Sequence, residues 1–187
     1  SGQLNNIPSG TFNQISTNYN HTCGIKSDGT LACWGDNSWG QLNNIPSGTF
    51  SQINAAGGYT CGLRSDGTLA CWGRNIYGEA TPLSGTFNRV SAGTWHACGL
   101  KNDGTVACWG LDDSGSTMPP NGTFSQISAG SNRTCGVPSD GTLTCWGYEA
   151  YGEAPMLSIN PSSLATGLVG NTYSQFLTLT DALYTPP

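Results

Sequence analysis

Charged side chains are scarce in this chain of 187 residues, of which only 9% are Asp, Glu, Lys or Arg. Lys and Arg together number 6, and the formal net charge is −5. Because a nucleic-acid partner requires a basic face that neutralises phosphates, we expect no binding to nucleic acid. No apolar run approaches the roughly 18 residues of a membrane span, so we expect no membrane insertion.

The chain also lacks any segment that keeps a helical apolar period over ten residues. Short apolar segments alternate with turns instead, and 27 residues are glycine. This pattern predicts an all-β fold of short strands. The sequence begins with Ser and without a signal peptide, from which we expect a mature or excised form.

One stretch of 13 residues occurs four times with small changes. It reads CGIKSDGTLACWG from Cys23, CGLRSDGTLACWG from Cys61, CGLKNDGTVACWG from Cys98 and CGVPSDGTLTCWG from Cys135. The period of 37 to 38 residues indicates stacked copies of one supersecondary unit. We place the repeat domain at 1–155, with full units at 9–46, 47–83, 84–120 and 121–155 after a partial unit at 1–8.

The repeated stretch predicts a β-hairpin. The Ser-Asp-Gly loop at 65–67 is a common three-residue hairpin connection, with Gly in the left-handed region. With that loop, Arg64 pairs with Thr68, and by the same count Cys61 faces Cys71. This is a non-hydrogen-bonded position with Cα atoms about 4.5 Å apart, which a disulfide can bridge. A two-residue loop would place the two cysteines diagonally instead.

All eight cysteines fall into such pairs, which predicts four disulfides and an oxidising, extracellular setting. The alternative is a metal site, but zinc sites favour cysteines about two to four residues apart. His21 and His96 share their repeat position with Tyr59 and Arg133, which favours packing or polar capping over ligation. We expect no cofactor. The predicted disulfides are Cys23–Cys33, Cys61–Cys71, Cys98–Cys108 and Cys135–Cys145.

A Trp-Gly pair closes every hairpin. We interpret these tryptophans as core between neighbouring units, and a row of rings for ligand stacking is the alternative; they are Trp34, Trp72, Trp109 and Trp146. Five residues later, a more variable position carries Trp39, Tyr77 and Tyr151, our candidates for binding at the rim.

The segments after Trp-Gly differ most between units, and variable loops are where a scaffold carries specificity. Their acidic residues could contact calcium or a glycan, but we interpret them as solvated loop charges. They are Glu79, Asp112, Asp113, Glu149 and Glu153.

The turn aspartates do not indicate catalysis, because each occupies the same turn of a different unit, where capping explains it. They are Asp28, Asp66, Asp103 and Asp140. No Ser/His/Asp or Cys/His set is recognisable, so we expect no enzymatic activity. Three sequons at Asn20, Asn121 and Asn132 are candidate glycosylation sites if the source is a secreted eukaryotic protein.

The pattern from Gly-Thr-Phe through the cysteine hairpin to Trp-Gly resembles the regulator of chromosome condensation repeat, in a secreted, disulfide-bearing form, over residues 1–155. The resemblance implies a β-propeller, usually of seven four-stranded blades with one repeat in each. It implies that Phe12 to Ser16 and its counterparts form the inner strand. The nuclear member exchanges nucleotide on a small GTPase, which we do not expect of an acidic, disulfide-bonded chain. A secreted member inhibits β-lactamases through its blade loops.

Four units are fewer than seven blades. Either three blades are missing from this sequence, or four blades form a small ring, or an open arc closes by association. An open arc leaves strand edges and apolar blade faces uncovered, which proteins avoid or use for assembly.

Residues 156–187 lose the cysteines and resemble the opening strands of bacterial immunoglobulin-like domains. They are too few for a two-sheet sandwich of about 100 residues. We therefore expect an immunoglobulin-like fragment or a tail that donates a strand to a neighbour. The candidate assembly strand includes Tyr173, Phe176, Leu177 and Leu179.

These observations favour a non-enzymatic extracellular structural protein. Our first hypothesis is a subunit of a surface fibre or adhesin, a homopolymer assembled through strand edges and the C-terminal tail. The alternative is a monomeric secreted binding module that recognises a protein or glycan through its blade loops.

Overall fold

The computed structural model describes residues 7–148, which contain twelve β-strands and no helix. Within this range no helix is therefore available to span a membrane. The strands form four antiparallel sheets of three, in the orders β1-β2-β3, β4-β5-β6, β7-β8-β9 and β10-β11-β12. Their bounds are β1 Phe12–Thr17, β2 His21–Lys26, β3 Leu31–Gly35, β4 Phe50–Ala55, β5 Tyr59–Arg64, β6 Leu69–Gly73, β7 Phe87–Ala92, β8 His96–Lys101, β9 Val106–Gly110, β10 Phe124–Ala129, β11 Arg133–Pro138 and β12 Thr144–Gly147.

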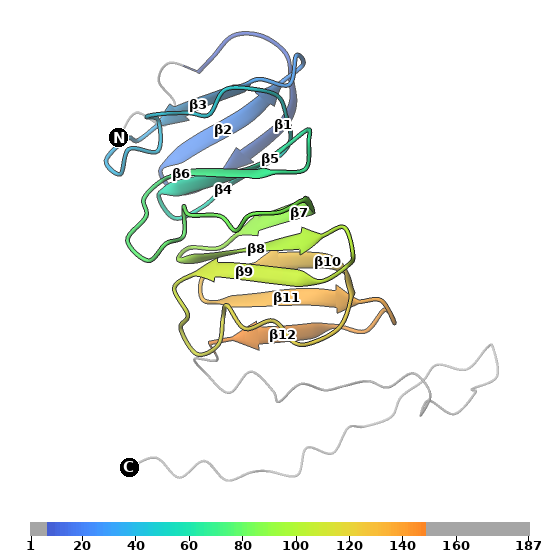
Figure 1. Cartoon of the computed structure of the whole chain (residues 1–187). Helices are drawn as coiled ribbons and strands as arrows, with labels where there is room; N and C mark the ends of the chain where they lie inside the picture. Colours follow the sequence, from blue (N-terminus) through green and yellow to red (C-terminus); the bar gives the residue numbers. More distant parts are fainter. Residues whose placement is uncertain (1–6, 149–187) are drawn as a thin grey trace, which may run out of the picture.

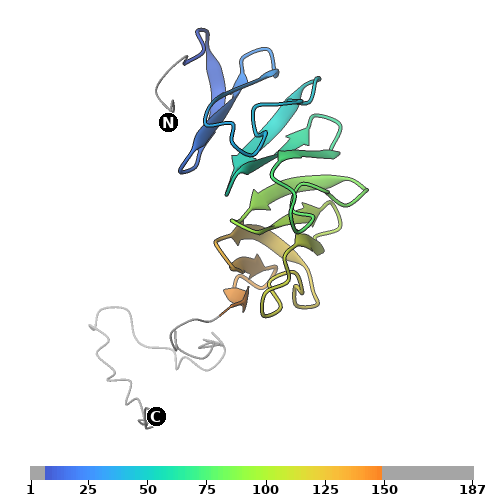
Figure 2. The same ribbon diagram turned by 90° about the vertical axis from the view of Figure 1, so that its left-hand side faces the viewer.

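Each sheet is one repeat, and we number the sheets as blades 1 to 4. The blades follow one another in a row in the order of the sequence (Figure 1, Figure 2). Their first strands lie beside one another, since Gln14 of β1 exchanges hydrogen bonds with the backbone of Ile53 in β4. The predicted all-β fold with one blade for each repeat is confirmed.

The cysteine hairpin has the predicted register in all four blades. In blade 2, Cys61 lies opposite Cys71. The Arg64 N–H donates to the Thr68 carbonyl at 2.8 Å, which closes the three-residue loop. All eight cysteines form the predicted disulfides, with Cα–Cα distances of 4.0 to 4.1 Å.

The aspartate of each hairpin loop caps its own turn. Asp66 Oδ1 accepts hydrogen bonds from the Thr68 hydroxyl at 2.7 Å and from the Thr68 N–H at 2.9 Å. These bonds, the hydroxyl first, hold the pKa of Asp66 below its ordinary value. The Gly67 that follows has φ 85°, a left-handed conformation that glycine adopts without strain. The same arrangement recurs in the other three loops.

A glycine after the first cysteine lets each blade close on its own phenylalanine. In blade 2, a Cβ on Gly62 would lie 2.7 Å from Phe50 Cδ1, so only glycine leaves room for the ring. The register of β4 against β5 shifts between Phe50 and Gln52, which is a β-bulge. Phe50 and Ile53 are then both buried at the contact with blade 1.

Hydrophobic clusters join neighbouring blades. Between blades 1 and 2, Cys23 and Ile25 pack with Phe50, Ile53 and Trp72. The cluster between blades 2 and 3 contains the residues at the equivalent positions, Cys61, Leu63, Phe87, Val90 and Trp109, together with Ala56, Tyr59, Ala92 and Ala97. The interpretation of the repeated tryptophans as core between units is therefore confirmed for these two.

Each described blade has three strands, whereas the resemblance implied four. The segment after the third strand forms a loop instead, held by side chains. In the loop 36–46, the Leu42 N–H donates to Asn37 Oδ1 at 2.8 Å, and Pro46 has no N–H to give to a ladder. The place of a fourth strand is taken by a loop with an internal hydrogen-bond network.

Candidate binding surface at the blade loops

The loop after each of the first three Trp-Gly pairs is held by one buried polar residue, seven positions after the tryptophan. We call these the anchor residues; they are Gln41, Glu79 and Ser116. The backbone carbonyl of each anchor accepts a hydrogen bond from the tryptophan indole N–H of the next blade. The pairs are Trp72–Gln41 at 3.0 Å, Trp109–Glu79 at 3.0 Å and Trp146–Ser116 at 3.2 Å. Each loop is thereby fixed to the blade after its own.

The anchor side chain fixes the tip of its loop. In blade 1, Gln41 Oε1 accepts from the Trp39 N–H at 2.8 Å, and Gln41 Nε2 donates to Asp36 Oδ2 at 3.1 Å. In blade 2, Glu79 Oε2 accepts from the Tyr77 N–H at 2.6 Å. Two of the three predicted rim residues therefore lie on a fixed loop tip, where Trp39 is 50% and Tyr77 46% exposed.

Glu79 is buried rather than solvated, with an exposed fraction of 0%. The Arg74 Nε donates to Glu79 Oε1 at 2.8 Å, and the same guanidinium donates to the Thr94 carbonyl. The interpretation of Glu79 as a solvated loop charge is wrong. Its position is inside the loop, where a carboxylate needs a paired cation and further hydrogen bonds.

Arg74 also stacks on an aromatic pair formed by Trp95 and the exposed Tyr77. Its Cζ lies 3.9 Å from the ring centroid of Trp95, and the Trp95 ring meets the edge of Tyr77 with centroids 5.7 Å apart. On the other side, a Cβ on Gly58 would lie 3.2 Å from Trp39 Cδ1 and 3.6 Å from Arg74 Cβ. Trp39 and Arg74 therefore both border Gly58, next to the stack of Arg74, Trp95 and Tyr77.

Sequence reasoning missed Arg74 and Trp95 as parts of this surface. The available signal was weak, since only unit 2 has a basic residue directly after Trp-Gly, and only unit 3 has a tryptophan before its corner histidine. Nothing in the sequence showed that these two positions from different repeats lie together.

A cleft of about 400 Å³ separates the loops of blades 1 and 2. Its lining includes the Trp39 ring and the amide side chains of Asn43, Asn44 and Asn75, and none of the lining residues is charged. The Asn44 side chain has no hydrogen-bond partner within residues 7–148, and its φ of 52° is in the left-handed region. Asn43 Oδ1 accepts from Asn37 Nδ2 at 3.0 Å, and the Asn75 side chain bonds to Thr81 and Ala80, so Asn44 is the amide left for a ligand. An aromatic ring beside a free amide suits a neutral ligand rich in hydroxyl or peptide groups.

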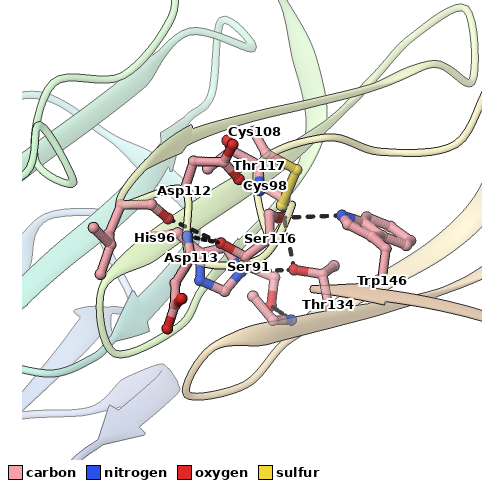
Figure 3. The surroundings of a disulfide bond; sticks show 12 residues. Ser91, His96, Cys98, Cys108, Asp112, Asp113, Ser116, Thr117, Thr134 and Trp146 are labelled. Carbon is pink, nitrogen blue, oxygen red and sulfur yellow. Dashed lines mark hydrogen bonds between the residues drawn. A yellow bond between two sulfur atoms is a disulfide. The ribbon is translucent and has the colours of Figure 1, made fainter. Parts of the chain in front are cut away.

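The aspartates of the third loop shape the loop itself. The Ser116 hydroxyl donates to the Leu111 carbonyl at 2.9 Å and accepts from the Asp113 N–H at 3.2 Å. Asp112 Oδ1 accepts from the Thr117 N–H at 3.1 Å (Figure 3). In the described part of the chain, no three His, Cys, Asp or Glu side chains come together to hold a metal ion.

The two histidines connect neighbouring blades. His21 Nε2 lies 2.7 Å from Thr60 Oγ1, and His96 Nε2 lies 2.7 Å from Thr134 Oγ1, the second pair shown in Figure 3. Burial lowers the pKa of His21 to about 4, against a smaller opposite effect of Asp36. Burial lowers the pKa of His96 as well. The interpretation of this position as polar capping is confirmed.

Between these two contacts, blade 2 uses tyrosine in place of histidine. The Tyr59 hydroxyl donates to the carbonyls of Gly93 at 2.9 Å and His96 at 2.7 Å. At the position where blades 2 and 4 have threonine, blade 3 has the smaller, fully buried Ala97. A histidine at the first position of the second strand is thus matched by a threonine at the second position of that strand in the next blade, and a tyrosine there is matched by an alanine.

The sequon asparagines differ in their surroundings. Asn20 and Asn121 are exposed, whereas Asn132 is partly buried and its Nδ2 lies 3.4 Å from Asp113 Oδ2. Glycosylation stays a prediction. No finding supports the start of an immunoglobulin-like domain, which lies outside the described residues, as do the predicted site residues Tyr151, Tyr173, Phe176, Leu177 and Leu179.

Four disulfide-closed blades, each with its third strand ending at the same side and the first three leading into a rim loop, define a propeller-type repeat protein (Figure 1). Four segments of the chain match the Regulator of chromosome condensation (RCC1) repeat, at residues 12–41, 50–79, 87–116 and 124–153. They cover more than half of the chain, and the chain belongs to this repeat family. Comparison with curated proteins finds no match.

Solved structures with similar folds include two plant receptor ectodomains. The ectodomain of the Physcomitrella patens receptor kinase CR4 is 27% identical, with a TM-score of 0.62 over 74% of this chain and 41% of that one. The CRINKLY WD40 ectodomain of the Arabidopsis thaliana receptor kinase ACR4 is 22% identical, with a TM-score of 0.65 over 79% and 55%. Prp20p of Saccharomyces cerevisiae is 17% identical, with a TM-score of 0.65 over 77% and 47%.

The chain therefore spans 41% to 55% of the length of these three structures. At 22% and 17% identity, the likeness to the second and third shows the propeller fold.

Proposed function

We propose that this chain is an extracellular, non-enzymatic binding module that recognises a protein or a glycan through the loops at one rim of its blades. The observation that carries this proposal is the common anchoring of the loops. The three anchor residues hold their loops to the next blade with the same carbonyl–indole hydrogen bond, while the exposed tips differ. A fixed frame with variable tips is the arrangement of a preorganised binding surface.

The disulfides support the extracellular part of the proposal, because such bonds persist in oxidising compartments. The two receptor ectodomains with a similar fold support it as well. The absence of enzymatic activity remains part of the proposal. It is supported by the turn aspartates, each of which is engaged in capping its own turn.

The test is a binding screen of the disulfide-intact chain against a glycan array and a panel of extracellular proteins. Trp39→Ala and Tyr77→Ala are expected to weaken a selected interaction at least tenfold, because exposed aromatic residues supply much of the energy of such surfaces. The matched control is Asn102→Ala, an exposed residue of a hairpin loop at the opposite end of its blade. Binding that neither rim variant changes would refute the proposal.

A second candidate function is the predicted subunit of a surface fibre or adhesin. The observation that favours it is the pair of blade faces at the two ends of the described row, where apolar residues are exposed. Electron imaging of the native material tests it, since a fibre subunit must form regular filaments. Discrete particles would contradict this second function.

A further inference from the structure

The contact between neighbouring blades is built from two different faces, and it occurs three times within the chain. We call the face of a blade that meets the preceding blade its leading face, and the opposite one its trailing face. The leading face of blade 2 supplies Phe50, Ile53 and Trp72, and the trailing face of blade 1 supplies Cys23 and Ile25. Blades 2 and 3 repeat this arrangement.

Polar contacts fix the register of this interface. The Gln14 side chain accepts from the Ile53 N–H at 3.0 Å and donates to the Ile53 carbonyl at 3.3 Å. Gln52 makes the same two bonds with Val90, at 3.0 and 2.9 Å. We call this contact the glutamine clamp. At the third interface Arg89 replaces the glutamine, and the two faces pack without a clamp.

A further hydrogen bond from a backbone N–H to a side chain crosses each interface, including the third, which has no clamp; between blades 2 and 3 the Ala92 N–H donates to Asn54 Oδ1. The Ala55 N–H donates to Ser16 Oγ at 2.9 Å, and the Ala129 N–H donates to Ser91 Oγ at 2.8 Å. The N–H of the phenylalanine that starts each following blade donates to the carbonyl of the preceding hairpin glycine. These pairs are Phe50–Gly29, Phe87–Gly67 and Phe124–Gly104, at 2.8 to 2.9 Å.

The leading face of blade 1 has every apolar part of the interface but no blade against it among the described residues. Ile15 is 63% exposed, whereas its counterpart Ile53 is 1% exposed. Ile15 lines a hollow together with Phe12, Pro8 and the ring of Trp34. The Ile15 backbone has no glutamine clamp within residues 7–148.

The trailing face of blade 4 has the complementary parts. Leu143 is 68% exposed, whereas its counterpart Leu31 packs against the core between blades 1 and 2. Gln126 occupies the clamp position and Ser128 the serine position. Both side chains are exposed and have no hydrogen-bond partner in the described range, and with Val137 they line a second hollow.

We propose that the trailing face of blade 4 packs against the leading face of blade 1 in a second copy of this chain. Gln126 clamps the N–H and carbonyl of Ile15, Ser128 accepts from the Thr17 N–H, and Leu143 covers the hollow beside Phe12. The partner is a second copy because both halves of one interface are present at opposite ends of the same chain (Figure 1). The parts match those that already hold blades 1 and 2 together.

This inference goes beyond ligand binding at the rim and does not depend on it. It gives the second candidate function a specific interface, but it also stands without a fibre. Because the two faces differ, the contact is head-to-tail, and a row of copies either closes into a ring or continues as a filament.

The test is analytical ultracentrifugation of the whole chain over a wide range of protein concentration. The wild type is expected to associate. Ile15→Asp removes the leading face and Leu143→Asp the trailing face, and each variant alone is expected to be monomeric. Because both side chains are exposed in the single chain, neither change disturbs a core. The control is Ile76→Asp, which changes an exposed apolar residue of a rim loop and is expected to leave association unchanged.

Mixing the two variants provides the decisive result. Ile15→Asp keeps an intact trailing face and Leu143→Asp an intact leading face, so an equimolar mixture is expected to form dimers that grow no further. A monomeric wild type would overturn the proposal, as would association of either variant alone or a mixture that stays monomeric. A discrete ring of wild-type copies would support the interface and exclude the fibre, which separates the two ideas.

Discussion

The hydrogen bond between His21 of blade 1 and Thr60 of blade 2, which we call the corner contact, can be tested by removing the threonine hydroxyl. Thr60 Oγ1 is the hydrogen-bond partner of His21 Nε2, and the other ring nitrogen, Nδ1, is buried with no partner in the described structure. Thr60→Ala therefore leaves both nitrogens of a buried histidine unpaired. A buried polar group that loses its partner costs about 1–3 kcal/mol, and we expect the free energy of unfolding to fall by that amount.

The compensating change is already present at the next interface, where Tyr59 is followed by Ala97. His21→Tyr alone presses a larger ring against Thr60, and overpacking of this kind costs roughly 1–3 kcal/mol. In the double variant, which combines His21→Tyr with Thr60→Ala, the new hydroxyl can donate to backbone carbonyls of blade 2. Tyr59 of blade 2 donates to carbonyls of blade 3 in the same way. We expect the double variant to be more stable than the sum of the single changes by about 1 kcal/mol or more.

The assay is urea denaturation at neutral pH with the disulfides intact, followed by tryptophan fluorescence and by circular dichroism. Repeat arrays can unfold in steps, so both probes must give the same transition before free energies are compared. Thr134→Ala is the matched control, because it removes the equivalent partner of His96 and is expected to have a similar cost. If the free-energy changes of His21→Tyr and Thr60→Ala add up to that of the double variant within about 0.5 kcal/mol, the idea that these two positions must match is refuted.

Three further outcomes follow from the structure. The pKa of His21 is about 4 in the folded chain and about 6.5 when unfolded, so its contribution is complete above pH 6.5 and is lost as the pH falls towards 4. The free energy of unfolding should fall by about 3 kcal/mol at pH 4 because of this residue, and the midpoint temperature of thermal unfolding should fall with it. A midpoint that stays constant between pH 4 and 7 would contradict this prediction. Replacing Cys61 and Cys71 together by Ala removes a short cross-link, and urea titration should show a loss of roughly 2–3 kcal/mol with the other three disulfides intact. Glu79→Ala leaves the Arg74 guanidinium buried without its carboxylate and should cost about 3–5 kcal/mol in the same titration, and a loss under about 1 kcal/mol would contradict a buried ion pair.

The hairpin could be predicted residue by residue because its determinants are local. The Ser-Asp-Gly loop at 65–67 sets the register, and the register places Cys61 opposite Cys71 without reference to any other repeat. The role of the repeated tryptophans followed from recurrence, since one position that carries the same large ring in every unit belongs to a shared core.

The candidate surface could be predicted only in part, because it is made by residues from different repeats. Trp39 and Tyr77 were found from their place in variable loops, but Arg74 meets Trp95 only after blades 2 and 3 have packed. Glu79 was misassigned for a related reason. Its backbone carbonyl accepts from the tryptophan of the following blade, and its partner Arg74 donates to the Thr94 carbonyl of that blade, and the loop sequence by itself contains neither residue.

The two kinds of contact between blades place different demands on mutation. An anchor presents a backbone carbonyl to the next tryptophan, so glutamine, glutamate and serine all serve, and the loop can change its sequence freely. At the contact made by His21, Tyr59 and His96, each histidine bonds to a threonine side chain of the next blade, whereas the Tyr59 hydroxyl bonds to backbone carbonyls of a blade that has the small Ala97 instead. The two residues that meet there must therefore match in size and polarity. Duplication or loss of a repeat therefore leaves the anchors working at once. Such a change creates a mismatched contact wherever a histidine then lies against an alanine. The order of the blades is therefore more constrained than the sequence of their exposed loops.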